Sequence, residues 1–246
     1  MGLALSAPAM RAMLLDSGSE VDFFIHSYYE FKLFGQTVSI NTTMVTTVIV
    51  MLGILTLMLI MRHEIMKEYT VPNTIQNIAE MLVETLDGLV ESNMGKHAKK
   101  YVNYIEILMI FLLFSNISGL FGLRAPTADF ATTFGLAVIT FVLIETAWVK
   151  SNGIRFVKDL FEPFPIFFPV NLISEFSTPV SMSLRLFGNV MAGTIMLGLW
   201  YGLMPWFAKI GIPAFLHAYF DLFSGLIQTY VFGMLTMVFI TDRYPD

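Results

Sequence analysis

Long apolar runs dominate this chain and predict helices that cross a membrane. Five stretches are each long enough to span a hydrocarbon core of about 30 Å, and they occupy residues 44–61, 104–122, 130–149, 170–204 and 213–241. The last two would form helices of about 50 Å and about 43 Å, so we expect them to tilt steeply, to bend or to be partly covered by protein. Pro179 marks one place for a bend.

The segments between these runs are more polar and predict two further parts of the fold. Over residues 72–91 the apolar side chains gather on one helical face and the acidic side chains on the opposite face. This pattern predicts an amphipathic helix on the membrane surface. Residues 1–40 mix acidic and aromatic side chains and are expected to form an arm outside the membrane. The predicted fold is all-α, with about five transmembrane helices and one surface helix in a single membrane domain over residues 41–246.

Composition supports the membrane as the solvent and excludes other classes of protein. Hydrophobic residues make up 56% of the chain and charged residues only 13%, too few to cover a soluble domain of 246 residues. The net charge of −5 and the lack of a dense basic block exclude nucleic acid as a partner. The chain has no cysteine, so disulfides and thiol chemistry are excluded.

Lysine and arginine are distributed unevenly over the two sides that five spans would create. One side would carry nine of these residues: Arg62, Lys67, Lys96, Lys99, Lys100, Lys150, Arg155, Lys158 and Arg243. The other side would carry four: Arg11, Lys32, Arg124 and Lys209. Because positively charged loops remain in the cytoplasm, we expect the N-terminus outside and the C-terminus in the cytoplasm. We expect a bacterial inner membrane rather than an organelle.

Arg185 lies near the middle of the fourth apolar run and is the first candidate functional residue. An arginine at membrane depth costs about 2.5 to 3.5 kcal/mol even on a lenient scale, so an interaction must offset it. Steps of four residues place it in a stripe of polar and small side chains: Ser177, Ser181, Arg185, Asn189 and Gly193. Ordinary packing of small residues explains the glycine and the serines but not the arginine. The alternatives are a buried ion pair, a functional cation, and a side chain that reaches an interface, which the uncharged stretch 186–208 makes difficult on that side.

The fifth run carries a shorter stripe that predicts an ion relay. His217, Asp221, Ser224 and Gln228 fall on one helical face, and chains of Asp, Glu and His mark ion pathways at membrane depth. A simple salt bridge between Asp221 and Arg185 is the alternative. Glu145 and Glu175 add two acids inside the third and fourth runs, and each fits an interfacial carboxylate as well as a relay group.

Two strings of residues resemble subunit a of the F-type ATP synthase. They are Pro-Val-Ser-Met-Ser-Leu-Arg-Leu-Phe-Gly-Asn at residues 179–189 and Leu-Ile-Gln-Thr-Tyr-Val-Phe at residues 226–232. The likeness extends over roughly residues 40–241. It implies a non-catalytic stator without a cofactor, in contact with a ring of c subunits, the b subunits of a peripheral stalk and membrane lipid.

The same resemblance implies a mechanism and assigns roles to residues of this chain. Two offset aqueous half-channels would deliver an ion to a ring carboxylate and release it after rotation. Arg185 would attract each arriving carboxylate, favour its ionised form and block a direct leak. Asn189 and Gln228 would be its polar neighbours.

The chain departs from the family pattern at three positions. Some members have a glutamate nine residues after the arginine, where this chain has Thr194, and a histidine seven residues before the glutamine, where it has Asp221. Some also have a glutamate fourteen residues before the arginine, where this chain has Asn171, and Glu175 would replace it.

Two other functions fit parts of the sequence. A secondary antiporter would use Arg185 and Asp221, although the internal repeats found in many such folds are not evident here. An intramembrane hydrolase would need a nucleophile beside a base, and Ser224 and His217 lie seven residues apart. The sequence leaves the coupling ion open between a proton and Na⁺.

Overall fold

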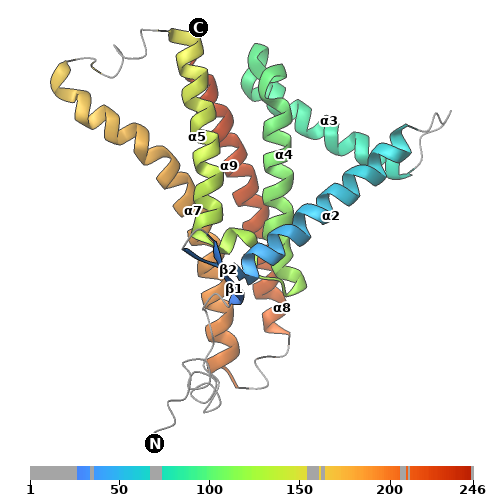
Figure 1. The fold of residues 1–246 in the computed structure, drawn as a ribbon. Helices are drawn as coiled ribbons and strands as arrows, with labels where there is room; N and C mark the ends of the chain where they lie inside the picture. Colours follow the sequence, from blue (N-terminus) through green and yellow to red (C-terminus); the bar gives the residue numbers. More distant parts are fainter. Residues whose placement is uncertain are drawn as a thin grey trace, which may run out of the picture.

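The computed structural model describes residues 27–33, 36–66, 74–153, 161, 164–205, 209 and 211–244. Within them, five helical segments are long and apolar enough to cross a membrane. Figure 1 shows them as an elongated bundle that opens toward one end. The predicted all-helical membrane fold with about five spans is therefore confirmed.

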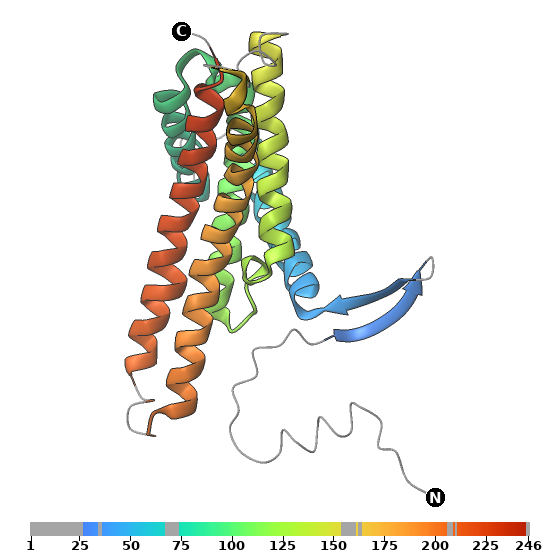
Figure 2. The same ribbon diagram turned by 90° about the vertical axis from the view of Figure 1, so that its left-hand side faces the viewer.

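A short β-hairpin precedes the helices and adds a feature that the sequence analysis did not predict. Strand β1 covers Ser27–Leu33 and strand β2 covers Gln36–Asn41, paired antiparallel with Glu30 opposite Ser39. Their aromatic and β-branched residues favour extended backbone. Figure 2 shows the hairpin projecting sideways from the start of the first helix. The hairpin occupies the last part of the predicted N-terminal arm, and residues 1–26 lie outside the described residues.

The first half of the bundle consists of a peripheral helix, an amphipathic helix and a central helix. Helix α2 spans Thr42–Ile65, and most of its apolar surface is exposed. Helix α3 spans Thr74–Met94; it buries Ala79 and Val90 while Glu84 and Glu91 remain exposed, as its amphipathic pattern predicts. Short 3₁₀ turns at Gly95–His97 and Ser118–Phe121 flank helix α4, Ala98–Ile117. Helix α4 lies between α3 and the last helix (Figure 1).

The second half contains three long helices that pack on α4 and on one another. After a 3₁₀ turn at Pro126–Ala128, helix α5 spans Phe130–Asn152. A turn at Pro165–Phe167 leads into α7, Phe168–Leu203, whose 36 residues continue through the buried Pro179. Figure 1 shows α7 changing direction part-way along its length.

The final span is a continuous rod with an irregular winding near its start. Helix α8, Ile212–His217, leads into a π-helical segment η6, Ala218–Phe223, and then into α9, Ser224–Thr241. Segments with π-helical winding occur frequently at functional sites because they re-aim the side chains around them. The rod runs antiparallel to α7, and the two are neighbours in both ribbon views (Figures 1 and 2).

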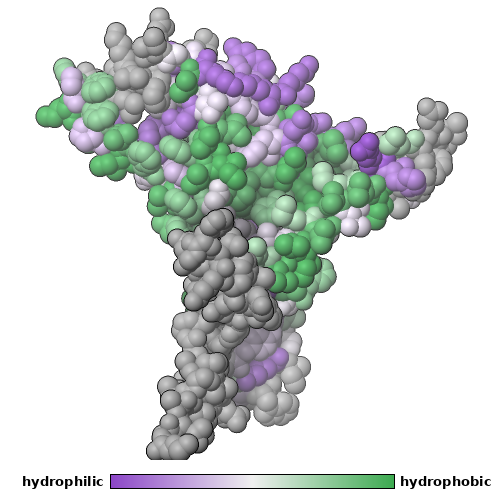
Figure 3. Space-filling model, in the orientation of Figure 1, coloured by the Kyte–Doolittle hydropathy of each residue, from purple (hydrophilic) through white to green (hydrophobic). Residues whose placement is uncertain are grey.

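The core consists of two clusters of buried apolar residues around α4 and α9. One cluster contains Val90, Met94, Ala98, Tyr101, Ile105, Met109, Ile144, Ala147, Met237 and Ile240. The other contains Leu108, Leu112, Ala137, Met182, Leu186 and Phe232. Outside this core, apolar side chains form a broad band on the surface, with hydrophilic residues gathered near one end (Figure 3). Such a surface suits lipid rather than water, and the chain is an integral membrane protein.

Candidate functional site

The polar stripe of α7 carries an exposed cation on an otherwise apolar helix. Arg185 lies on the exposed side of α7, whereas the neighbouring Ser183 and Leu186 are fully buried. Within the described residues Arg185 makes no hydrogen bond and no ion pair. A cation within an apolar helix that has no partner among the described residues requires compensation from another group or from water.

One helical turn beyond Arg185, an amide bridge joins the two long helices. The Nδ2 atom of Asn189 donates to Oε1 of Gln228 at 2.6 Å. Gln228 is only 3% exposed, and its Nε2 atom has no hydrogen-bond partner among the described residues. A buried donor without a partner is costly, so a water molecule or an ion-carrying group is expected to face it.

Asp221 pairs with a histidine one turn away in the same rod. Its Oδ2 atom lies 2.6 Å from Nδ1 of His217, whose Nε2 atom is 3.4 Å from the hydroxyl of Tyr201. A Cβ atom at Gly119 would lie 3.1 Å from the Asp221 carboxyl group, so glycine leaves room for this side chain. The alternative salt bridge between Asp221 and Arg185 is not formed.

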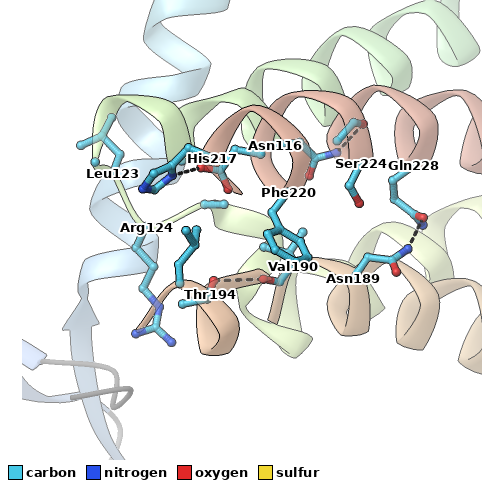
Figure 4. Close-up of a pocket in the computed structure, with 16 residues that line it drawn as sticks. Asn116, Leu123, Arg124, Asn189, Val190, Thr194, His217, Phe220, Ser224 and Gln228 are labelled. Atoms are coloured by element: carbon cyan, nitrogen blue, oxygen red, sulfur yellow. Dashed lines mark hydrogen bonds and ion pairs between the residues drawn. The ribbon is translucent and has the colours of Figure 1, made fainter. Parts of the chain in front are cut away.

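A cavity of about 320 Å³ brings most of the predicted residues together. Figure 4 shows side chains from α4, the following loop, α7 and the α8–α9 rod that line it. Predicted residues in its lining are Asn189, Thr194, His217, Asp221, Ser224 and Gln228. The hydroxyl of Thr194 donates to the backbone of Val190 at 3.0 Å, so its oxygen can still accept a bond from a guest. We call this space the first cavity.

Asn116 of α4 also lines the first cavity, and the sequence analysis missed it. Its Nδ2 atom donates to the Gly225 carbonyl at 3.2 Å and lies 3.4 Å from the Thr229 hydroxyl, while its Oδ1 atom accepts from Thr127 at 2.9 Å. The asparagine thus fixes the wall of the cavity between α4 and α9. An amide inside an apolar run was the available signal.

A second cavity of about 450 Å³ lies on the other side of the arginine along α7. Arg185 lines it together with hydroxyl groups from the same helix: Ser174, Ser177, Thr178 and Ser181. Leu235 and Phe239 of α9 complete the wall. Arg185 therefore stands at the end of one polar cavity, and Asn189, one turn further on, belongs to the other.

Glu145 and Glu175 lie apart from Asp221 and form a separate cluster with Arg243. The guanidinium of Arg243 makes a short hydrogen bond and ion pair with Glu175, and it is 4.0 Å from Glu145. It also lies 4.1 Å from the centroid of the Trp148 ring, a cation–π contact. The sequence analysis used Arg243 only in the charge count that predicts membrane orientation. Its position directly after the last apolar run was the available signal for a further role.

The donor sets of these sites suit a small cation in transit rather than a resident metal. Among the described residues there is no group of three or more His, Cys, Asp or Glu side chains that could hold a metal ion. Amides, hydroxyls and one carboxylate line the first cavity, and hydroxyls with Arg185 line the second. Such groups are typical of pathways that bind an ion weakly and release it. The fold and the two cavities define an integral membrane protein of ion transport.

Comparison with known proteins identifies the family. Residues 43–241 match the family model described as ATP synthase A chain. The chain is 41% identical over 224 residues to "ATP synthase subunit a, sodium ion specific" of Propionigenium modestum, covering 84% of this chain and 75% of that protein. It is 34% identical over 233 residues to ATP synthase subunit a of Priestia megaterium, covering 89% and 97% respectively.

This chain belongs to the ATP synthase subunit a family, as the two sequence strings predicted. Membership implies a membrane-embedded subunit of the ion-translocating F0 part of an ATP synthase, in a complex with other F0 subunits.

Proposed function

We propose that this chain is the stator that offers two half-channels to a rotating ring of c subunits, with Arg185 between them. One observation carries the proposal: an exposed arginine, unpaired within the part of the chain that the structure describes, separates two polar cavities on one helix. The first cavity would connect to one side of the membrane and the second cavity to the other. An ion could then pass between them only by riding on the ring.

Arg185 would act on the ring carboxylate through its charge. A guanidinium keeps its proton at any physiological pH and favours the ionised form of a nearby acid, so it would release the bound ion into a half-channel. The same positive charge would repel a cation that moves directly from one cavity to the other. Asn189 and Gln228 would supply neutral hydrogen-bonding groups beside this exchange.

His217 and Asp221 would relay ions within the first cavity, with Thr194 as a hydroxyl ligand on its wall. A histidine can exist with or without charge near neutral pH, so the pair can accept and return a proton without a permanent change of charge. In the second cavity, the hydroxyls of α7 would solvate the ion on its way to Glu175 and Glu145. The chain itself would hydrolyse nothing.

The relative from Propionigenium modestum is named as sodium ion specific, which favours Na⁺ as a candidate for the coupling ion here. ATP-driven pumping measured in reconstituted vesicles with and without Na⁺ would test this. A requirement for Na⁺ would support Na⁺ as the coupling ion. Full pumping in Na⁺-free buffer would show that the coupling ion is the proton.

The decisive test replaces Arg185 in the assembled ATP synthase. Arg185→Ala should abolish ATP synthesis while membrane insertion and assembly persist, and Arg185→Lys should restore it only partly, because an ammonium lacks the guanidinium fork. Arg62→Ala removes an exposed arginine from the last turn of α2 and is the matched control. Normal synthesis in the Arg185→Ala complex would refute the proposed function.

The proposed partners and orientation can be tested separately. Co-purification with a ring of small proteolipid subunits would distinguish the stator from a secondary antiporter, and b subunits of a peripheral stalk should accompany it. Cysteines introduced at Lys99 and Lys32 should label from opposite sides of the membrane, with Lys99 in the cytoplasm, in line with the nine-to-four charge bias. Equal labelling from outside would refute this orientation.

A further inference from the structure

The cluster of Glu145, Glu175 and Arg243 lies beside the second cavity, although none of its three side chains is among the residues that line it. Ser174, the residue before Glu175, lines the cavity on α7, and Phe239, four residues before Arg243, lines it on α9. Because the two helices run antiparallel, Arg185 and Leu235 lie at the inner end of the same cavity. An ion that moves along this cavity away from Arg185 would meet the cluster.

The three side chains are partly buried and share their interactions unequally. Their exposed fractions are 21% for Arg243, 21% for Glu175 and 23% for Glu145. Arg243 hydrogen-bonds to Glu175, but its distance of 4.0 Å to Glu145 is too long for a hydrogen bond. The Oε1 atom of Glu145 is buried and has no hydrogen-bond partner among the described residues. Arg243 thus compensates the charge of Glu175 directly, whereas Glu145 lies in the fields of both the guanidinium and the Glu175 carboxylate.

Two basic side chains near the cluster, Lys100 and His97, interact with Tyr244 rather than with the two carboxylates. Lys100 of α4 donates to the hydroxyl of Tyr244 at 2.9 Å, and His97 stacks on the Tyr244 ring with centroids 3.9 Å apart. These contacts fix the residue next to Arg243, and among the described residues no second cation forms an ion pair with either carboxylate. Counted over its three side chains alone, the cluster carries a single net negative charge.

We propose that Arg243 tunes ion release by holding the cluster beside the second cavity at one net negative charge, an inference that rests on the proposed function. A conducting site must attract its ion strongly enough to admit it and weakly enough to release it. Without Arg243 two uncompensated carboxylates would retain a cation. With only one carboxylate beside Arg243 the cluster would be neutral and would attract a cation poorly. Arg243 would therefore act by setting the net charge of the cluster, and it would not itself bind the ion.

The test is a charge-count series in the assembled complex, with the rate of potential-driven Na⁺ and proton flux through F0 in vesicles as the readout. Arg243→Ala and Glu145→Gln each shift the net charge by one unit, in opposite directions. Each should slow the flux by roughly tenfold, the size of a one-charge change that acts over about 12 Å through an effective dielectric constant of about 20. The double variant regains one net negative charge and should recover most of the flux, and Arg243→Lys should stay near the unaltered rate.

A purely structural role predicts a different pattern. If Arg243 only ties the end of α9 to α5 and α7, the double variant should be as slow as the slower single variant or slower, and this result would overturn the inference. Recovery in the double variant at equal assembly yield would support it. Arg185→Ala in the same preparation separates the two proposals, because normal ATP synthesis there would refute the proposed function whatever the Arg243 series shows.

Discussion

The two ends of the α7–α9 pair hold their carboxylates with different partners. Beside the first cavity, Asp221 pairs with the imidazole of His217. Beside the second cavity, Glu175 pairs with Arg243, whose charge is permanent. The first arrangement allows a proton to move between partners, and the second fixes the electrostatic field. The difference suggests that one end exchanges ions within the protein while the other adjusts how readily an ion leaves.

The backbone around the carboxylates also differs between the two ends. Asp221 lies in the π-helical segment Ala218–Phe223, where the winding is irregular, whereas Glu175 lies in the regular helix α7. The space for the Asp221 side chain comes from Gly119 of the neighbouring turn. The first end thus combines an irregular winding with space for a side chain, whereas the second combines a regular helix with an ion pair.

Replacing Asp221 by Asn would test this contrast with the largest expected effect. The amide keeps the shape and can still accept a bond from His217 but cannot ionise. We expect normal assembly with ATP-driven pumping slowed by roughly 10- to 100-fold, the range in which proton transfer by a positioned side chain falls, together with a changed pH dependence.

Glu84→Gln is the control for this variant, because Glu84 is an exposed acid on α3 that lines neither cavity. Pumping should be unaltered in the control. If Asp221→Asn also pumps normally at normal assembly yield, Asp221 is not a relay group. If assembly fails, the aspartate is structural, and the contrast between the two ends disappears.

Gly225→Ala should reduce the thermal stability of the complex by disturbing the wall of the first cavity. A Cβ atom there would lie 2.8 Å from Cβ of Asn116, which its hydrogen bonds to Gly225, Thr229 and Thr127 hold in place. Overpacking of this kind costs about 1 to 3 kcal/mol. The thermal midpoint of the detergent-solubilised complex should fall.

Gly135→Ala in helix α5 is the control, because no atom lies within 4 Å of the new Cβ position. Its stability should be unchanged or slightly raised, since alanine favours a helix over glycine. A midpoint that stays constant in Gly225→Ala would mean that α4 and α9 can separate without cost at this point. The wall of the first cavity would then be able to deform without loss of stability.

The spans and the polar stripes were accessible from the sequence because both are local properties. Apolar runs identify helices without any knowledge of their neighbours, and steps of three and four residues place Asn189 beside Arg185 or Gln228 beyond Asp221 on one face. The β-hairpin was missed although polar and apolar residues alternate over residues 30–33 and 37–41. Its strands of seven and six residues are short, and their alternation is a weaker signal than the long apolar runs that follow.

The cluster around Arg243 and the role of Asn116 depend on contacts between distant segments. Arg243 meets Glu175 across 68 residues of sequence, and Asn116 meets Gly225 across 109. A single sequence gives the faces of each helix but not the relative rotation and register of two helices, so it cannot pair their polar residues. For the same reason the π-helical winding near Asp221 was not predicted.

The bridge between Asn189 and Gln228 should show a measurable coupling. Asn189→Ala and Gln228→Ala each remove one partner of the 2.6 Å hydrogen bond, and the double variant removes both. The coupling energy from thermal or denaturant unfolding should be about 0.5 to 1.5 kcal/mol, the usual net value of such a bond. Strictly additive effects would show that the two amides act independently and that α7 and α9 are joined only by apolar packing.

Tyr244→Phe should have the smallest effect and would test how firmly the fixed end is braced. Burial disfavours the phenolate, but hydrogen bonds with Lys100 and Tyr101 outweigh it and lower the pKa of Tyr244. Phenylalanine keeps the stacking on His97 and loses only the two bonds to the hydroxyl, each worth about 0.5 to 1.5 kcal/mol before solvent exposure reduces it. We expect a small fall in thermal midpoint with unchanged ion flux. A large loss of flux instead would mean that the position of Arg243 depends on its neighbour, and that the end of the second cavity is held by Tyr244 as much as by the pair with Glu175.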